Sequence, residues 1–129
     1  MIKLMAFVSR LPHVDREAFK AYYETRHAPL ILGLIPSICG YERNYPDMSK
    51  YRPPEGKTLD DVLGFDAVTV IRFADRDGLD AFKRAMRDPE IARIIREDEA
   101  NFLDNSKSRL FVVDERVSQL ESKAHSLAH

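Results

Sequence analysis

The residue with the clearest capacity for chemistry is His27, because it occupies an apolar position of a helical pattern. At intervals of four, four, three and four, this pattern contains Phe19, Tyr23, His27, Leu30 and Leu34, which share one face of a helix. Such a face normally packs into the core and is apolar throughout. The imidazole is therefore either a packed core histidine bonded to a backbone carbonyl or a group kept for acid–base chemistry.

Pro29 indicates that the predicted helix is irregular beside His27. A proline has no backbone N–H, so the carbonyl of Thr25 loses its helical partner and the ring crowds that turn. We expect the helix to kink or loosen here, which would make the imidazole accessible.

A second candidate group is Asp98, which falls on the apolar stripe of a later helical segment. At intervals of four, three and four, this stripe consists of Ile91, Ile95, Asp98 and Phe102. Glu97 and Glu99 are expected to point elsewhere. A buried carboxylate is costly unless a partner compensates it, so Asp98 either meets His27 and orients its ring, or is a cap or surface carboxylate.

Further side chains are candidates for ligand contact. Phenol donors are available from Tyr22, Tyr23, Tyr41 and Tyr45, although aromatic residues at such spacings are also common in cores and interfaces. On the second predicted strand, either Arg43 or Asn44 must face inward. The residues that we expect to bind substrate are Tyr23, Tyr41, Arg43, Phe7 and Phe102.

The composition is typical of a single domain that can form its own hydrophobic core. The chain has 129 residues, 44% of them hydrophobic, which is enough to fold without disulfides or metal. A net charge of −1, from 20 basic and 21 acidic residues that are intermixed, argues against nucleic acid as a partner. The single cysteine, Cys39, cannot form an intramolecular disulfide and is interpreted as structural.

No segment of the sequence resembles a membrane anchor or a cofactor motif. The first ten residues are too short and regular for a signal peptide, and no stretch approaches the ~20 apolar residues of a bilayer span. We therefore expect a cytoplasmic protein. Gly-rich phosphate loops, paired cysteines and the known hydrolase motifs are absent, and His13, His125 and His129 lie in a turn and a tail. We expect no metal and no cofactor.

The elements that position these residues follow a recognisable order. Strands are predicted at Ile2–Ser9, from Ile38 to about Tyr45, at Phe65–Phe73 and at Leu110–Val113. One predicted helix is capped by Asp15 and ends at Pro36. A second begins at Asp75 or Asp77 and stops at Asp88-Pro89, and the same pair begins a third.

This order predicts an α+β, ferredoxin-like βαββαβ domain over residues 1–116, with an antiparallel sheet and both helices on one face. Residues 46–63 form a long connection without obvious periodicity, and a lid is one role for it. Residues 117–129 are expected to form a peripheral helix or a disordered tail.

The predicted sheet is apolar on both faces. In the first strand Ile2 and Leu4 alternate with Met5 and Phe7, and the third strand shows a similar pattern. Helices cover only one face, and the chain has too little left to cover the other. A homodimer whose two sheets pack face to face, as in a dimeric α/β barrel, accounts for the pattern.

Several of these residues together resemble the EthD-like proteins. The resemblance rests on Phe7-Val8-Ser9-Arg10, on Phe19-x-x-Tyr22-Tyr23 followed by Arg26-His27-Ala28-Pro29-Leu30, and on Asp98-Glu99-x-x-Phe102. It covers residues 1 to about 115 and implies a dimeric α/β barrel. Related barrels include polyketide cyclases, muconolactone isomerases, pigment-pathway dehydratases and an auxiliary protein of an ether-degrading cytochrome system, which share a small-molecule cavity rather than one reaction.

The resemblance implies that His27 is the acid–base residue and Asp98 its partner. We expect a cofactor-independent isomerase, cyclase or lyase that acts on an aromatic, lactone or polyketide-like compound, with Tyr23 or Tyr41 at an enolate-like oxygen. The alternative is a non-catalytic accessory protein that binds an apolar compound for a partner oxygenase. A cofactor-free or haem-dependent monooxygenase is a third possibility, suggested by analogy of fold alone.

Overall fold

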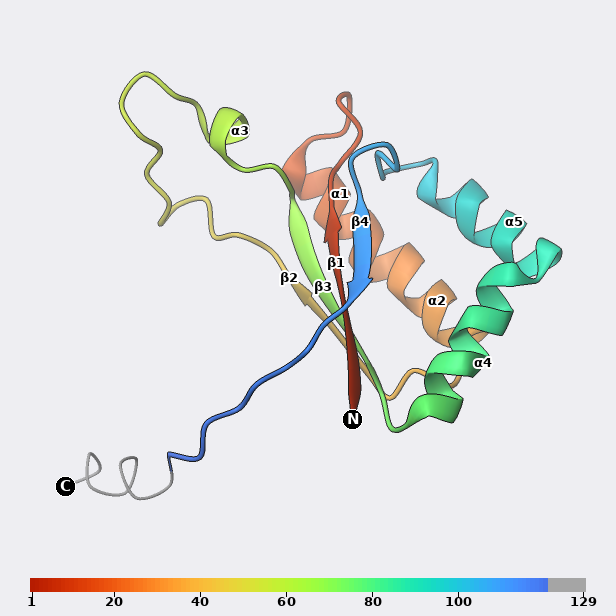
Figure 1. Ribbon diagram of the computed structural model, residues 1–129. Coiled ribbons are helices and arrows are strands. Elements are labelled where there is room, and N and C mark those ends of the chain that lie inside the picture. Colours follow the sequence, from red (N-terminus) through yellow and green to blue (C-terminus); the bar gives the residue numbers. More distant parts are fainter. Residues whose placement is uncertain (121–129) are drawn as a thin grey trace.

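Four antiparallel strands form one sheet in the order β2-β3-β1-β4 (Figure 1). The strands are β1 (Ile2–Val8), β2 (Gly40–Asn44), β3 (Ala67–Phe73) and β4 (Arg109–Val112). Their order along the chain relative to the helices confirms the predicted ferredoxin-like α+β fold. The structure is a computed structural model that describes residues 1–120.

The helices begin where aspartates cap them. The helical segments are α1 (Arg16–Tyr22), η1 (Tyr23–His27), α2 (Ala28–Leu34), α3 (Leu59–Val62), α4 (Arg76–Arg87) and α5 (Pro89–Glu99). Asp15 caps α1 and Asp75 caps α4, each accepting from the backbone N–H three residues ahead. Asp88 ends α4 and caps α5, as predicted. Among residues 1–120, none of these helices is long and apolar enough to cross a membrane.

The helix that carries His27 contains one π turn. In η1 the Ala28 N–H donates to the Tyr23 carbonyl, five residues back instead of four. Pro29, which lacks an N–H, lies at the start of α2. The predicted loosening beside His27 is confirmed, and it takes the form of a wider turn within a helix that continues on both sides.

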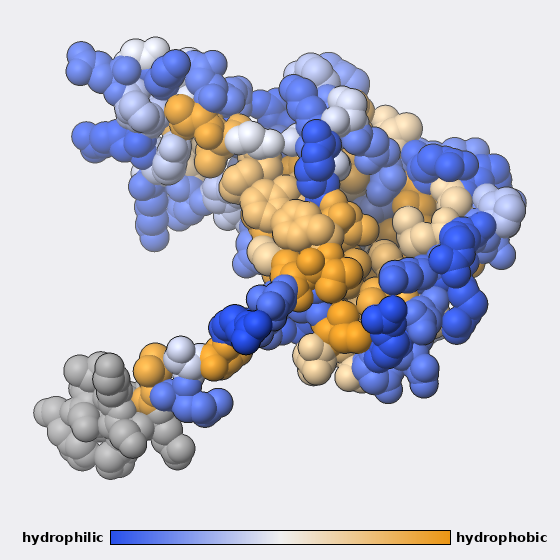
Figure 2. Space-filling view, in the orientation of Figure 1, coloured by the Kyte–Doolittle hydropathy of each residue, from blue (hydrophilic) through white to orange (hydrophobic). Residues whose placement is uncertain are grey.

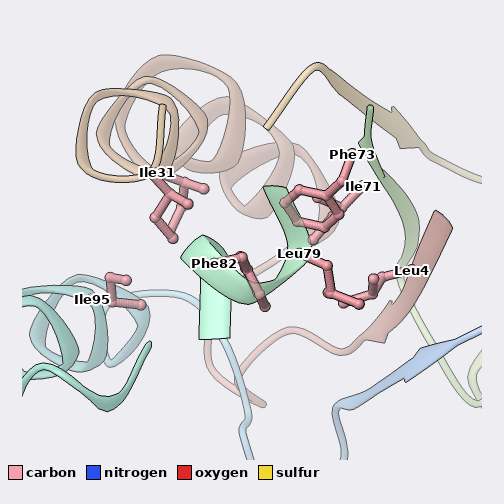
Figure 3. Packing of buried hydrophobic residues seen from close by; sticks show 8 residues of the cluster. Leu4, Ile31, Ile71, Phe73, Leu79, Phe82 and Ile95 are labelled. Carbon is pink, nitrogen blue, oxygen red and sulfur yellow. The ribbon is translucent and has the colours of Figure 1, made fainter. Parts of the chain in front are cut away.

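Two clusters of buried side chains hold the helices against the sheet. The first cluster, shown in Figure 3, consists of Leu4, Ile31, Ile35, Ile71, Phe73, Leu79, Phe82 and Ile95. The second consists of Val8, Phe19, Tyr23, Ala28, Ala67, Phe102 and Leu103. Because burying one large apolar side chain stabilises a fold by about 1.5–3 kcal/mol, these clusters fix the helix that carries His27 and the helix that carries Asp98 on one face of the sheet.

The pairing register decides which strand residues face the helices. Tyr41 pairs with Ile71, and Arg43 pairs with Thr69, whose side chain is buried beneath the helices. Since side chains alternate along a strand, Arg43 faces the helices and Asn44 faces away from them. The register therefore shows that Arg43, and not Asn44, is the inward-facing residue, which the sequence alone left open.

The opposite face of the sheet is also apolar, as predicted. The Phe7 ring stacks on Phe111 at 5.8 Å between centroids and meets the edge of Phe65 at 5.2 Å. On the edge strand β4, Phe111 pairs with Met5, lies on this outer face and is 46% exposed. Figure 2 shows apolar side chains gathered over this middle part of the sheet.

The connection over residues 46–63 contains one helix that the sequence pattern did not predict. Four residues are too few to show a helical period, and α3 forms because Thr58 heads a capping box. Asp60 of this helix pairs with Arg10 and Arg16, near the end of β1 and the start of α1. These ion pairs attach the connection to the body of the domain.

The chain after β4 leaves the body of the domain. Val113 and Glu115 still bond to Lys3 of β1, whereas residues 116–120 extend away from the domain (Figure 1), and 117–120 form no helix or strand. The rest of the expected tail, residues 121–129, lies outside the described residues, so the domain boundary at 116 stays a prediction.

An ion pair joins the π turn to β2. The Glu24 carboxylate accepts from Arg43 Nε at 2.9 Å and Nη2 at 2.7 Å, and from the Tyr45 hydroxyl at 2.5 Å. The two bonds from the guanidinium make this a bidentate pair. Chiefly because of the Arg43 hydrogen bonds, the pKa of Glu24 is lowered to about 2.

We predict that this pair makes stability depend on acid pH. The pKa of Glu24 is lower in the folded state than its ordinary value of 4.5, so its contribution is fully present above pH 4.5 and is lost as the pH falls toward about 2. Urea denaturation across this range should show that the free energy of unfolding falls more steeply for the unmodified protein than for Glu24→Gln. The exposed Glu55→Gln serves as the control, and parallel curves for Glu24→Gln and the unmodified protein would contradict the prediction.

Candidate functional site

His27 and Asp98 lie within hydrogen-bond distance. The ring nitrogen Nδ1 of His27 is 2.8 Å from Asp98 Oδ2. The His27 side chain is only 4% exposed, and the Asp98 side chain is 19% exposed. The ring packs against Phe102 at 5.0 Å and Tyr23 at 5.6 Å between centroids, which fixes its plane.

Asp98 is held at its second oxygen as well. The Tyr22 hydroxyl donates to Asp98 Oδ1 at 2.7 Å, and Asn101 Nδ2 donates to the Tyr22 hydroxyl at 3.0 Å. Burial, with the hydrogen bond to Asp98, raises the pKa of the Tyr22 phenol, so the hydroxyl remains a donor. Both carboxylate oxygens therefore act as acceptors.

This arrangement selects one tautomer of His27. An ionised carboxylate can only accept, so Nδ1 carries the proton that it shares with Asp98. In the neutral ring, Nε2 then has a free lone pair. A histidine held in this way can accept a proton at Nε2, which is the role of a general base.

The π turn explains why two tyrosines and His27 converge. In an α-helix Tyr23 and His27 would share a face, and Tyr22 would point away from it. The turn of η1 takes one extra residue, so position 27 falls between the directions of positions 22 and 23. Tyr23 then packs on the ring while Tyr22 reaches the carboxylate that holds the ring.

A cavity of about 250 Å³ adjoins His27. Its apolar lining includes Val8, Ile31, Ile71, Phe82, Ile95 and Leu103. These side chains come from both core clusters, so the cavity lies where the two clusters meet. A mostly apolar pocket with few polar groups is typical of a site for a small organic ligand.

Two tyrosines bring hydroxyl groups to the cavity wall. The Tyr23 hydroxyl is 2.6 Å from Thr69 Oγ1, and both residues line the cavity. Burial raises the pKa of Tyr23 and of Tyr41, which also lines the cavity. Both phenols thus stay protonated and available as hydrogen-bond donors.

Glu99 also lines the cavity, which corrects the expectation that it points away from the site. Its Oε2 is 3.9 Å from His27 Nε2, and Asn105 Nδ2 donates to its Oε1 at 3.2 Å. Burial raises the pKa of the Glu99 carboxyl, against the opposing effect of His27. The site therefore holds two carboxyl groups, one at each nitrogen of the ring.

The residues expected to bind substrate separate into two groups. Tyr23 and Tyr41 line the cavity. Arg43 faces the helices but is bonded to Glu24 and to the Tyr41 carbonyl. Phe7 lies on the opposite face of the sheet, and Phe102 is fully buried behind the His27 ring.

Two polar residues of the wall were not recognised in the sequence, although each had a signal. Glu99 continues the four-residue spacing of Ile91 and Ile95, so it shares their side of α5. Thr69 is a polar residue in the inward series of β3, two residues before Ile71. Both signals are interruptions of an apolar pattern.

Other parts of the structure do not compete with this site. A larger hollow of about 640 Å³ lies between α1 and residues 45–49, but its lining mixes charged and apolar side chains and does not include His27 or Asp98. None of residues 46–63 lines the His27 cavity, so the role of that loop as a lid stays a prediction. Within residues 1–120, no three His, Cys, Asp or Glu side chains are grouped to hold a metal ion.

Several solved structures share the fold. An ethyl tert-butyl ether D (EthD) family protein from Bacillus halodurans is 21% identical, with a TM-score of 0.58 over 90% of this chain and 100% of its own. The protein At3g17210 from Arabidopsis thaliana is 12% identical, with a TM-score of 0.58 over 93% and 100%. HapK from Hahella chejuensis is 14% identical, with a TM-score of 0.56 over 92% and 96%. At these identities the likeness establishes the fold alone.

The family follows from the sequence itself. Among curated proteins, none matches this chain. The model of the EthD domain, however, matches residues 11–106, which include both His27 and Asp98 and make up well over half of the chain. The chain therefore belongs to the EthD family.

Proposed function

We propose that this protein is a cofactor-independent acid–base enzyme in which His27 Nε2 moves a proton on a small apolar or aromatic compound that carries oxygen. The observation that carries the proposal is the Asp98–His27 hydrogen bond at the wall of an apolar cavity. Isomerisation, cyclisation and elimination all begin with such a transfer.

The roles of the residues follow from their contacts. His27 acts as the base, and Asp98 holds its tautomer and stabilises the imidazolium that forms. Tyr22 keeps Asp98 in place. The phenols of Tyr23 and Tyr41 face the same cavity and can donate to an oxygen on which negative charge develops.

The alternative is a carrier of apolar compounds for a partner oxygenase, which would use the same cavity without chemistry. The two functions differ in what happens after binding. A compound that binds beside His27 and is recovered unchanged, at the same rate with and without the imidazole, would favour the carrier.

We predict that turnover depends on the His27 imidazole. Aromatic lactones, aromatic ketones and polyketide-like acids would first be screened by thermal shift, because a ligand at 100 times its Kd stabilises by about 2.7 kcal/mol. Conversion of each hit would then be followed by NMR. His27→Asn, which keeps a donor near Asp98 but has no base, should lower kcat by roughly 100- to 10,000-fold.

The matched control for this experiment is His13→Ala, because His13 lies exposed in the turn after β1. It should leave the rate unchanged. An unchanged kcat in His27→Asn would remove the imidazole from the mechanism.

We predict that Asp98→Asn inactivates the enzyme by reversing the tautomer of His27. The Asn amide can donate to Nδ1, which moves the ring proton to Nε2 and removes the free lone pair. Activity should fall by about 100-fold or more, while binding is retained. The ¹⁵N shifts of the imidazole report the tautomer independently of activity. Asp80→Asn on the exposed side of α4 is the control, and an Nδ1-protonated ring in Asp98→Asn would refute this account.

We also propose that two copies of the chain pack through the outer face of the sheet. The aromatic pair of Phe7 and Phe111 lies on this face, and Phe111 is 46% exposed. The neighbouring Leu110 and Val112 are about half exposed on the other side of the same edge strand. A sheet with helices on one face only and an apolar second face normally packs against another layer.

The homodimer predicts a particle with twice the mass of one chain in sedimentation velocity at micromolar concentration. Phe111→Glu should give monomers, because a carboxylate would be buried without a partner. Leu32→Glu, at an exposed apolar residue of α2, should remain dimeric. A monomeric unmodified protein, or a dimeric Phe111→Glu, would disprove packing through this face.

A further inference from the structure

Glu99, a partly buried carboxyl group near Nε2 of His27, has no role in the proposed function. The Glu99 side chain is 21% exposed and lines the cavity together with His27. Asn105 binds one of its oxygens, and the other lies 3.9 Å from Nε2. This distance is too long for a direct hydrogen bond, so both atoms remain available to a third group.

The geometry points to Glu99 as a second catalytic residue, a general acid that acts on a carbonyl oxygen while His27 Nε2 removes the proton from the adjacent carbon. The substrate class is then a neutral ketone or lactone with an acidic C–H next to the carbonyl. The inference rests on the proposed function, because it requires Nε2 to be the base.

The spacing of the two groups suits this reaction. Standard bond lengths place a carbonyl oxygen about 2.4 Å from the carbon next to the carbonyl carbon. Two catalytic atoms 3.9 Å apart can each reach one of these positions at hydrogen-bond distance, with Oε2 at the oxygen and Nε2 at the C–H. Tyr23 can add a hydrogen bond to the same oxygen when its hydroxyl turns from Thr69 toward the cavity.

The proton transfers balance within the site. The C–H bond breaks, its proton forms an N–H bond at Nε2, and its electron pair forms the C=C bond of an enol. The π electrons of the carbonyl take up the proton released by the Glu99 carboxyl. The products are an enol, an imidazolium and a carboxylate, and the last two attract one another across the cavity. An isomerisation is complete when the imidazolium returns its proton to a different carbon and the Glu99 carboxylate takes back the enol O–H proton, which restores the carbonyl and both catalytic groups.

The charges around Glu99 favour a neutral substrate. His27 from η1 and Asn105 from the loop after α5 lie closest to the Glu99 carboxyl, and Asp98 and Arg96 on α5 are the other groups that influence its pKa. Burial raises its pKa, which favours the protonated form that a general acid needs. A substrate carboxylate beside Glu99 would place two acidic groups in one buried site, where both cannot be ionised at low cost. Arg109 lines the cavity too, but it is exposed and bonded to backbone carbonyls.

The test uses phenylacetone, a neutral ketone with an acidic methylene, and phenylpyruvate, which has the same skeleton with a carboxylate. Binding is measured by calorimetry, and exchange of the phenylacetone methylene protons in D₂O by ¹H NMR. We expect phenylacetone to bind at least tenfold more tightly than phenylpyruvate, and Glu99→Gln to reduce that preference. The exchange rate should fall roughly 100-fold in Glu99→Gln. Glu97→Gln, on the exposed side of α5, should leave both quantities unchanged.

The outcomes separate the two proposals. If His27→Asn abolishes exchange and Glu99→Gln does not slow it, Glu99 is not the acid, and the proposed function stands. If phenylpyruvate binds as tightly as phenylacetone, or phenylacetone does not bind, the substrate class is wrong. If phenylacetone binds and the unmodified protein does not accelerate its exchange, His27 is not the base and Glu99 is not the general acid proposed here.

Discussion

The hydrogen bond between His27 and Asp98 is the interaction on which the arrangement of the site depends. It joins the first helical segment to α5, two parts of the chain that are 71 residues apart. The bond requires η1 to turn His27 toward α5 and requires α5 (Pro89–Glu99) to pack with Asp98 on the side that faces η1. Tyr22, Asn101 and Phe102 then complete the surroundings of the pair from the same two regions.

Much of the fold could be predicted from the sequence because its signals are local. Asp15, Asp75 and Asp88 cap helices by bonding to backbone N–H groups within three residues, so the starts of α1, α4 and α5 are visible in short stretches. The alternation of apolar residues located the strands to within one or two residues. The α3 helix was not predicted, because a single turn is too short to show a helical period.

The site was less predictable, because its geometry depends on where the helical period changes. Regular spacing placed Asp98 on the stripe facing His27, and the structure brings the two together. The same spacing predicted that Glu99 points elsewhere, because the stripe continues from Ile95 to Asp98. In the structure α5 presents both Asp98 and Glu99 to the imidazole, one near each ring nitrogen. The pairing of Arg43 with Glu24 depends on strand register and a π turn, neither of which a local pattern encodes.

The cavity beside His27 lies between the two core clusters, and this position affects how the ligand of such a domain can change. Phe19, Tyr23 and Ala28 belong to one cluster and Ile31 and Ile35 to the other, so the helix passes from one cluster to the next just after the π turn. The cavity is the gap left at this junction, not a hole within a close-packed interior. The side chains that line the cavity are themselves members of the two clusters, so a substitution there changes the space for a ligand and the packing of one cluster together. A change of ligand in this domain is therefore coupled to a rearrangement of its core.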